Sequence, residues 1–250
     1  MNRTAALIAM AVLVVTAPRV RAEVVSLEIS SRTPYDGGRT FGDRGSYQRC
    51  RGKLGFAVDP SLAANRQIVD LELAPRNANG KVEFSADFEI LAPSDLAKAS
   101  GSLLYDVNNR GNRTCLGQFN GGGDDFLMRQ GYIVVWSGWI AEVLPGGDRL
   151  RMNAPVATDG GRPVRGLVRA EMAPDREAER LNIAHWGNQG SYPPSERGLD
   201  RATLTWRLRE KDARVPVPRS QWRLEQTWVE ADGERGQLPL IELVLAGGFQ

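Results

Sequence analysis

The chain has 250 residues, of which 42% are hydrophobic and 25% are charged, so it is long enough to bury one large core or two modest ones. Its 32 basic and 30 acidic residues give a formal charge of +2. This balance provides no overall electrostatic attraction to nucleic acid or to an anionic membrane. Binding to either would have to use a local basic patch.

The first 22 residues have the pattern of a secretory signal peptide. Arg3 supplies a positive start, an apolar run extends from Ala5 to Ala17, and Ala22 is a small residue suited to the cleavage position. We predict cleavage after Ala22 and export to the periplasm or the extracellular space. The apolar run is too short to cross a bilayer as a helix, and no later segment is longer, so we expect no stable membrane anchor. Three basic residues leave with this segment, and the remaining chain carries 29 basic and 30 acidic residues.

Residues 24–93 have a β pattern. Four alternating or apolar runs predict strands, at residues 25–29, 53–58, 68–73 and 82–91. The last two are separated by a polar loop that contains Asn79-Gly80, a strong hairpin signal. We therefore expect residues 68–73 and 82–91 to pair as antiparallel neighbours.

Residues 101–139 carry the pattern on which the fold prediction depends. Leu103–Val107 and Tyr132–Trp136 are short apolar runs that predict buried strands. The 24 residues between them, 108–131, are enough for the crossover that joins parallel strands. A helix in this crossover is expected to begin at Asp124-Asp125, because acidic residues favour a helix N-terminus. The two strands should be parallel neighbours.

The last part of the chain predicts a β-rich insertion. We expect strands at residues 167–172, 203–208, 222–229 and 238–245, and a short exposed helix over residues 175–182. The chain stops soon after its last strand, which we interpret as truncation of a longer reading frame. The predicted organisation is a leader at 1–22, a first domain at 23–140 and the insertion at 141–250.

Cys50 and Cys115 are the two cysteines. An exported compartment permits a disulfide between them, which would stabilise the fold by roughly 4 kcal/mol, but two separate buried thiols fit the sequence equally well. No cysteine or histidine stands at metal-ligand spacing, and no phosphate-binding glycine loop is present. We expect neither a metal nor a cofactor.

Catalytic signals are weak. The Gly-x-Ser-x-Gly pattern of a nucleophile elbow does not occur. Cys115 is followed by Leu116-Gly117, half of a cysteine version, but Arg113 stands in the place of the first glycine. The single histidine, His185, is the one ordinary candidate for a histidine base, yet no nucleophile accompanies it. The sequence favours non-catalytic roles for Cys115 and His185.

A polar turn follows the strand at residues 103–107. In a parallel sheet, loops beyond the carboxyl ends of the strands bind ligands, and in serine hydrolases such a loop donates a backbone N–H to the oxyanion hole. The candidates for this role are Asn109, Arg110, Gly111 and Asn112. The alternative is a plain turn with Gly111 at positive φ.

Short motifs are spread over the chain at residues 37–42, 45–47, 58–60, 65–70, 74–77, 87–88, 104–105 and 109–112, and more thinly at 192–193 and 247–249. They resemble the N-terminal part of the bacterial α/β-hydrolase domain-containing proteins, an exported family. The resemblance implies an α/β fold, an incomplete α/β-hydrolase-like mixed sheet with antiparallel N-terminal strands. It also implies a nucleophile in a Gly-x-Ser-Gln-x-Gly-Arg motif beyond Gln250, followed by an acid and a histidine.

Two functions follow as expectations. The first is an exported serine hydrolase that acts on ester or related acyl bonds of a small-molecule substrate, with its catalytic half absent from this chain. The alternative is a non-catalytic exported β-rich domain with a binding or structural role.

Overall fold

Strands dominate the architecture of this protein. The computed structural model describes residues 22–184, 189–192, 194–195, 197–230 and 236–249. The α-helices in these residues are α1 (Cys115–Phe119) and α2 (Phe126–Arg129). The main sheet contains β1 (Ala22–Pro34), β2 (Tyr47–Val58), β3 (Val82–Pro93), β4 (Leu103–Tyr105), β5 (Ile133–Ser137) and β6 (Met152–Asn153). The smaller sheets contain β7 (Thr158–Asp159), β8 (Arg162–Pro163), β9 (Ala178–Asn182), β10 (Thr205–Trp206), β11 (Val215–Pro216), β12 (Trp222–Glu230) and β13 (Gln237–Phe249).

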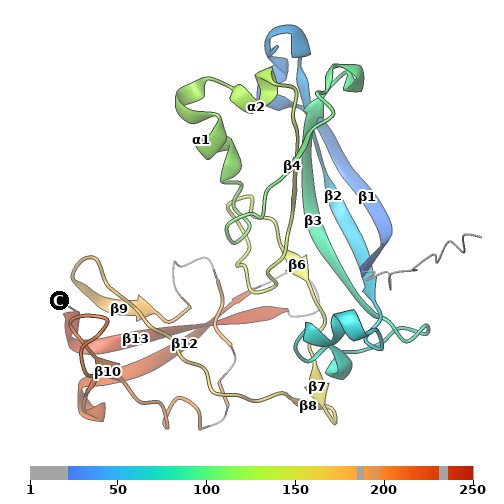
Figure 1. The fold of residues 1–250 in the computed structure, drawn as a ribbon. Coiled ribbons are helices and arrows are strands. Elements are labelled where there is room, and N and C mark those ends of the chain that lie inside the picture. Colours follow the sequence, from blue (N-terminus) through green and yellow to red (C-terminus); the bar gives the residue numbers. More distant parts are fainter. Residues whose placement is uncertain (1–21, 185–188, 193, 196, 231–235, 250) are drawn as a thin grey trace, which may run out of the picture.

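The main sheet has the strand order β1-β2-β3-β5-β4, with β6 paired to β3 beside this path (Figure 1). Its neighbours are antiparallel except β4 and β5, which are parallel with Leu103 opposite Ile133. This confirms the parallel pair predicted from residues 103–107 and 132–136. The crossover contains α1 and α2, and α2 begins directly after Asp124-Asp125, as expected.

The core lies on one face of this sheet, which we call the core face. Because strand side chains alternate between faces, Tyr47 of β2, Leu91 of β3 and Trp136 of β5 all point to this side. They pack with Leu127 and Met128 of α2, and all five residues are buried. The Tyr47 hydroxyl lies 3.1 Å from the backbone oxygen of Met128, so the hydroxyl ties β2 to the crossover.

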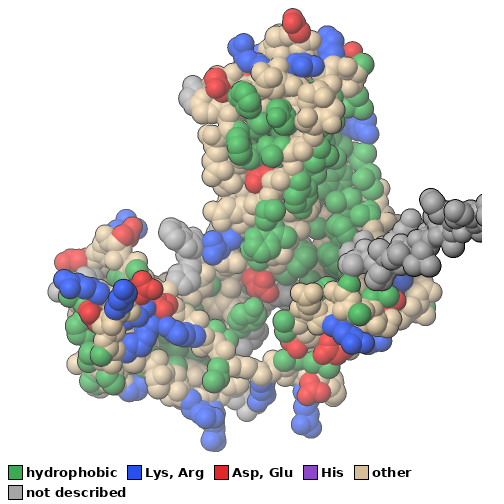
Figure 2. Space-filling view, viewed as in Figure 1, with side chains coloured by type: hydrophobic (Ala, Val, Ile, Leu, Met, Phe, Trp, Pro, Cys, Tyr) green, Lys and Arg blue, Asp and Glu red, His purple; other side chains and the backbone are tan. Residues whose placement is uncertain are grey.

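The opposite side of the sheet carries a second set of hydrophobic side chains, which we call the apolar face. Its members are Val24, Leu27, Ile29, Leu54, Phe56, Phe84, Phe88, Ile90, Leu103, Tyr105, Ile133 and Val135. Cross-strand partners share a face, which fixes this set from the sheet register. In Figure 2, hydrophobic side chains gather over the region of β1, β2 and β3. Several members are largely exposed, including Leu27 at 57% and Leu103 at 60%.

A separate antiparallel sheet has the order β12-β13-β9 and lies beside one end of the main sheet (Figure 1). Alternate residues of β13, among them Ile241 and Leu243, are buried. The two parts meet where Val143 forms a β-bridge with Gln189 and where the Gly190 N–H donates to the Glu142 carbonyl at 2.8 Å. The predicted strands at 222–229 and 238–245 are confirmed, and that at 203–208 is reduced to β10.

The predicted α/β fold, with an incomplete α/β-hydrolase-like sheet, is wrong. Helices of five and four residues are too short to form a layer over a sheet. Within the described ranges, strands are distributed over one large and three small sheets that are antiparallel apart from the β4–β5 pair. The fold is therefore β-rich.

Four local predictions are also wrong. Residues 68–73 form no strand. Instead, the 3-10 turn η4 (Leu71–Leu73) places Leu71 against Val58 and Val82, so its apolar side chain closes an end of the sheet. The turn at Asn79-Gly80 exists, but β3 pairs with β2. Residues 167–172 form no strand, and the helix expected over 175–182 is β9, which gains hydrogen-bonded pairing along β13.

Candidate functional site

The turn after β4 is held by one buried side chain. Asn108 is 1% exposed, its Nδ2 donates to the Ser137 carbonyl at 2.6 Å, and its Oδ1 accepts from the Gly111 N–H at 2.7 Å. Arg110 and Gly111 both have positive φ, 50° and 84°. Gly111 is required there, because a Cβ would lie 2.7 Å from the Leu150 carbonyl oxygen.

The predicted oxyanion residues share this turn, and most of their amides are used within it. Asn109 and Asn112 exchange two backbone hydrogen bonds of 3.0 Å each. The Gly111 N–H is bonded to Asn108, as described above. In this conformation the N–H groups of Asn109, Gly111 and Asn112 therefore point into the turn and not toward a ligand. The oxyanion role of residues 109–112 stays a prediction.

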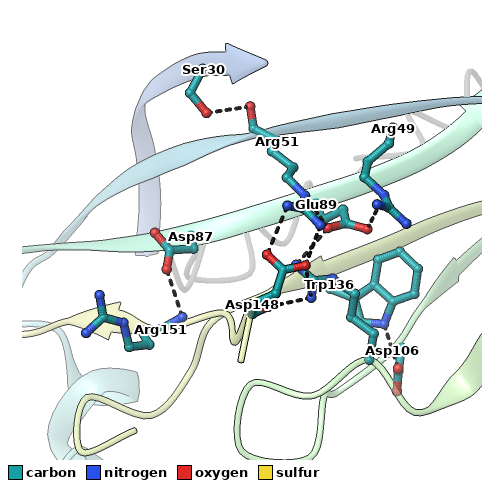
Figure 3. Close-up of polar contacts among 10 residues, drawn as sticks. Ser30, Arg49, Arg51, Asp87, Glu89, Asp106, Trp136, Asp148 and Arg151 are labelled. Atoms are coloured by element: carbon teal, nitrogen blue, oxygen red, sulfur yellow. Dashed lines mark hydrogen bonds and ion pairs between the residues drawn. The ribbon is translucent and has the colours of Figure 1, made fainter. Parts of the chain in front are cut away.

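A carboxylate beside this turn anchors the core. Asp106 Oδ2 accepts from Trp136 Nε1 at 2.6 Å and from the Cys115 N–H at 3.2 Å (Figure 3 shows the contact with Trp136). Burial of the Cys115 thiol, together with a hydrogen bond to Asp106, raises the pKa of Cys115 to about 12. The thiol is therefore protonated at neutral pH and is a poor nucleophile.

The two cysteines do not form a disulfide in the structure, which corrects that alternative. Both thiols are free. On β2, Tyr47 and Arg49 point to the core face, so Cys50 points to the opposite face. Cys115 lies in the core cluster with Trp136. The sheet itself thus separates the two sulfur atoms.

A charged cluster lies on the core face next to Trp136. Glu89 of β3 is fully buried and is approached by three guanidinium groups (Figure 3). The Nε of Arg51 lies 2.7 Å from Glu89 Oε2, Arg113 Nη2 lies 2.7 Å from the same oxygen, and Arg49 Nε lies 3.1 Å from Oε1. The more exposed Asp148 accepts two hydrogen bonds from Arg51, at 2.9 and 2.6 Å. We call these five residues the Glu89 cluster.

The register of the sheet assembles the Glu89 cluster. Arg51 stands directly opposite Glu89, and Arg49 stands opposite Leu91, two positions along the same face. Arg113 arrives from the turn after β4. Asp148 belongs to the loop that donates the Leu150 N–H to the Gly111 carbonyl at 3.0 Å. Three other chain segments therefore converge around the carboxylate that β3 carries.

The chemistry of the Glu89 cluster is that of a structural clamp. Burial lowers the pKa of Arg51, but the hydrogen bond to Asp148 and the charge of Glu89 outweigh it and raise the pKa overall. Arginines that stay charged at all relevant pH values offer no proton for acid–base catalysis. The buried Nε atoms of Arg49 and Arg113 make no hydrogen bond of good geometry, although Arg49 Nε is within ion-pair distance of Glu89.

Alternation along the strand does not by itself reveal this cluster. In residues 82–91 it groups Glu89 with Glu83, Ser85 and Asp87, a set typical of an exposed face, and the only apolar residue on that side is Leu91. A charged residue at a core-facing strand position requires partners of opposite charge. Arg49 and Arg51, two residues apart on β2, match that requirement.

His185, the candidate histidine base, lies outside the described residues. The part of the chain that the structure describes contains no group of three or more His, Cys, Asp or Glu side chains arranged to hold a metal ion. Across the same ranges, no helix is long and apolar enough to span a bilayer.

Comparisons with known proteins do not identify the function. No family model, curated protein or solved structure matches the chain.

Proposed function

We propose that this chain is a non-catalytic β-rich binding domain that associates through the apolar face of its main sheet, with export as predicted from residues 1–22. The observation that carries the proposal is the breadth and neutrality of that face. On β2, β3, β4 and β5 every position that points to it is uncharged, and Arg32 at the end of β1 is the one charge among the paired strand positions.

Exposure of these side chains is unfavourable unless a partner covers them. Val24, Leu27 and Leu103 are each more than half exposed. Isolated exposed hydrophobic residues are ordinary, but a contiguous apolar patch marks an interaction surface. Strands in a parallel pair are usually covered on both faces, but Leu103 and Tyr105 of the edge strand β4 are 60% and 50% exposed on this side.

The area of the apolar face suits a second copy of the chain. Strands about 4.8 Å apart that rise about 3.3 Å per residue give it an area on the order of 700 Å². A standard protein interface covers roughly 800 Å² on each partner. Because the one charge on the face, Arg32, lies toward the end of β1, two copies can pack sheet against sheet about 10 Å apart without burying unpaired charges at the centre. We therefore infer a symmetric homodimer.

Sedimentation equilibrium of residues 23–250 tests this proposal. The wild-type protein is expected to dimerise, and Leu27→Glu is expected to be a monomer, because the carboxylate would be buried without a partner. The matched control is Leu167→Glu, which places the same charge at a fully exposed position away from the apolar face. Circular dichroism verifies that both variants fold. A wild-type protein that stays monomeric over all measured concentrations contradicts the proposal.

A serine hydrolase that acts on ester or related acyl bonds is the second candidate. It is favoured by the position of the turn at residues 108–112, which follows the carboxyl end of β4 beside its parallel neighbour β5. The test is the coding sequence beyond Gln250. An open frame that encodes the Gly-x-Ser-Gln-x-Gly-Arg motif and a later histidine supports this candidate, and a stop codon opposes it.

A further inference from the structure

A basic pocket lies at the end of the main sheet where β2 and β5 begin. It is an open depression with a volume of about 640 Å³. The charged residues that line it are Asp43 and Arg44 of the 3-10 turn η2 (Gly42–Arg44), Lys98 of the 3-10 turn η5 (Leu96–Lys98), and Arg129 at the end of α2. The buried Phe41 contributes an apolar wall.

The backbone around the pocket holds one arginine in place. Arg44 Nη1 donates to the Lys98 carbonyl at 3.1 Å, so η2 and η5 are joined through this side chain. Gly131, with φ of +77°, makes room for it, because a Cβ there would lie 3.0 Å from Arg44 Nε. The guanidinium group thus occupies a defined position in the wall of the pocket.

Salt bridges within the described residues do not neutralise the cations of the pocket, although Arg129 also acts electrostatically on Asp125. Among the residues that the structure describes, no ion pair joins Arg44, Lys98 or Arg129 to a carboxylate. The nearby Arg39 differs, because it pairs with both Asp36 and Asp125. Three cations against the single acidic Asp43 leave the pocket with a formal charge of +2.

We propose that this pocket binds a phosphate monoester. A phosphate monoester carries a charge of about −1.5 to −2 at pH 7, which matches the pocket. A guanidinium group presents paired N–H donors in a planar fork that fits phosphate oxygens, and an ammonium group adds a mobile point charge. The site combines two guanidinium groups and one ammonium group. A lipid headgroup and a soluble metabolite share this chemistry, so the experiment must separate them.

Calorimetric titration with glycerol 3-phosphate provides the first measurement, with glycerol as the uncharged control ligand. Saturable binding is expected for the ester alone, and it should weaken with added salt. Lys98→Gln and Arg129→Gln are each expected to weaken binding about tenfold, because a charge-assisted hydrogen bond is lost. Both residues are exposed, so both variants should fold. Lys53→Gln, which removes an exposed lysine from β2 outside the pocket, should bind normally.

The second measurement is co-sedimentation with phosphatidylcholine vesicles that contain phosphatidic acid. Binding of glycerol 3-phosphate supports a soluble phosphorylated ligand, and binding to these vesicles alone that is lost in Lys98→Gln supports a lipid headgroup. Absence of saturable binding in both measurements overturns the proposal. Equal weakening by Lys53→Gln and Lys98→Gln also overturns it, because the attraction would then be unspecific.

Discussion

Substitution of Glu89 by glutamine tests whether the Glu89 cluster is a structural clamp. The side chain is fully buried between three arginines, with nitrogen–oxygen distances of 2.7, 2.7 and 3.1 Å. Glu89→Gln keeps the shape but removes the one buried negative charge, leaving the guanidinium groups of Arg49, Arg51 and Arg113 opposed only by the exposed Asp148. Loss of one partner from a buried ion pair costs about 3–5 kcal/mol. We expect a decrease of roughly 4 kcal/mol in the free energy of unfolding, a large part of the usual 5–15 kcal/mol.

Urea denaturation followed by tryptophan fluorescence measures this loss, since Trp136 stands opposite Glu89 in the sheet. Asp148→Asn is the control within the same cluster. The side chain of Asp148 is 62% exposed, so its ion pair with Arg51 should contribute less than about 1 kcal/mol. A Glu89→Gln variant that loses under about 1 kcal/mol, or no more than Asp148→Asn, would refute the clamp.

Three further predictions concern the sheet and the thiols. Gly52→Ala should destabilise the protein by about 3 kcal/mol or more in urea denaturation, because the added Cβ would lie 1.8 Å from the Glu28 carbonyl oxygen and β1 would have to move. An unchanged urea concentration at the unfolding midpoint contradicts this prediction. Burial raises the pKa of Cys115 and that of Tyr47 to about 12. Both groups ionise at a lower pH in the unfolded chain than in the folded protein, so the free energy of unfolding should be at its full value below about pH 8 and should fall as the pH rises toward 12. A melting temperature that does not change with pH over this range argues against both shifts. A thiol reagent should modify the half-buried Cys50 in the native protein and Cys115 only after unfolding, whereas a disulfide-linked peptide in a non-reducing digest would show that the two pair.

Local periodicity was enough to predict the strands that carry the main sheet. Residues 25–29, 53–58 and 82–91 alternate apolar and polar side chains, and all three form strands whose apolar positions, such as Leu27, Leu54 and Phe88, lie on the apolar face. The spacing between residues 103–107 and 132–136 also predicted their parallel pairing. Parallel neighbours need a long crossover that returns the chain to the same end of the sheet, whereas a short turn joins antiparallel strands.

Predictions failed where a distant partner decides the local structure. Residues 175–182 carry mixed charges that suit an exposed helix, but β9 pairs with β13, and Arg180 forms ion pairs with Glu225 and Glu242. Residues 68–73 are apolar enough for a strand, yet Asp70 adopts φ of 57° and turns the chain. Neither the pairing partner nor the positive φ is encoded in a short window of sequence. The same limit explains why Glu89 was not predicted as a buried site.

The two faces of the main sheet suggest a division of roles. On the core face, Glu89 and Asp106 fix the strands and the turn after β4 through charges and hydrogen bonds that are used within the chain. On the apolar face, side chains such as Leu27 and Leu103 remain exposed. We therefore assign the proposed binding to the apolar face and to the basic pocket around Arg44, and not to the Glu89 cluster. Under this proposal Glu89→Gln, in conditions where it remains folded, should change stability and leave the proposed dimerisation and phosphate binding intact.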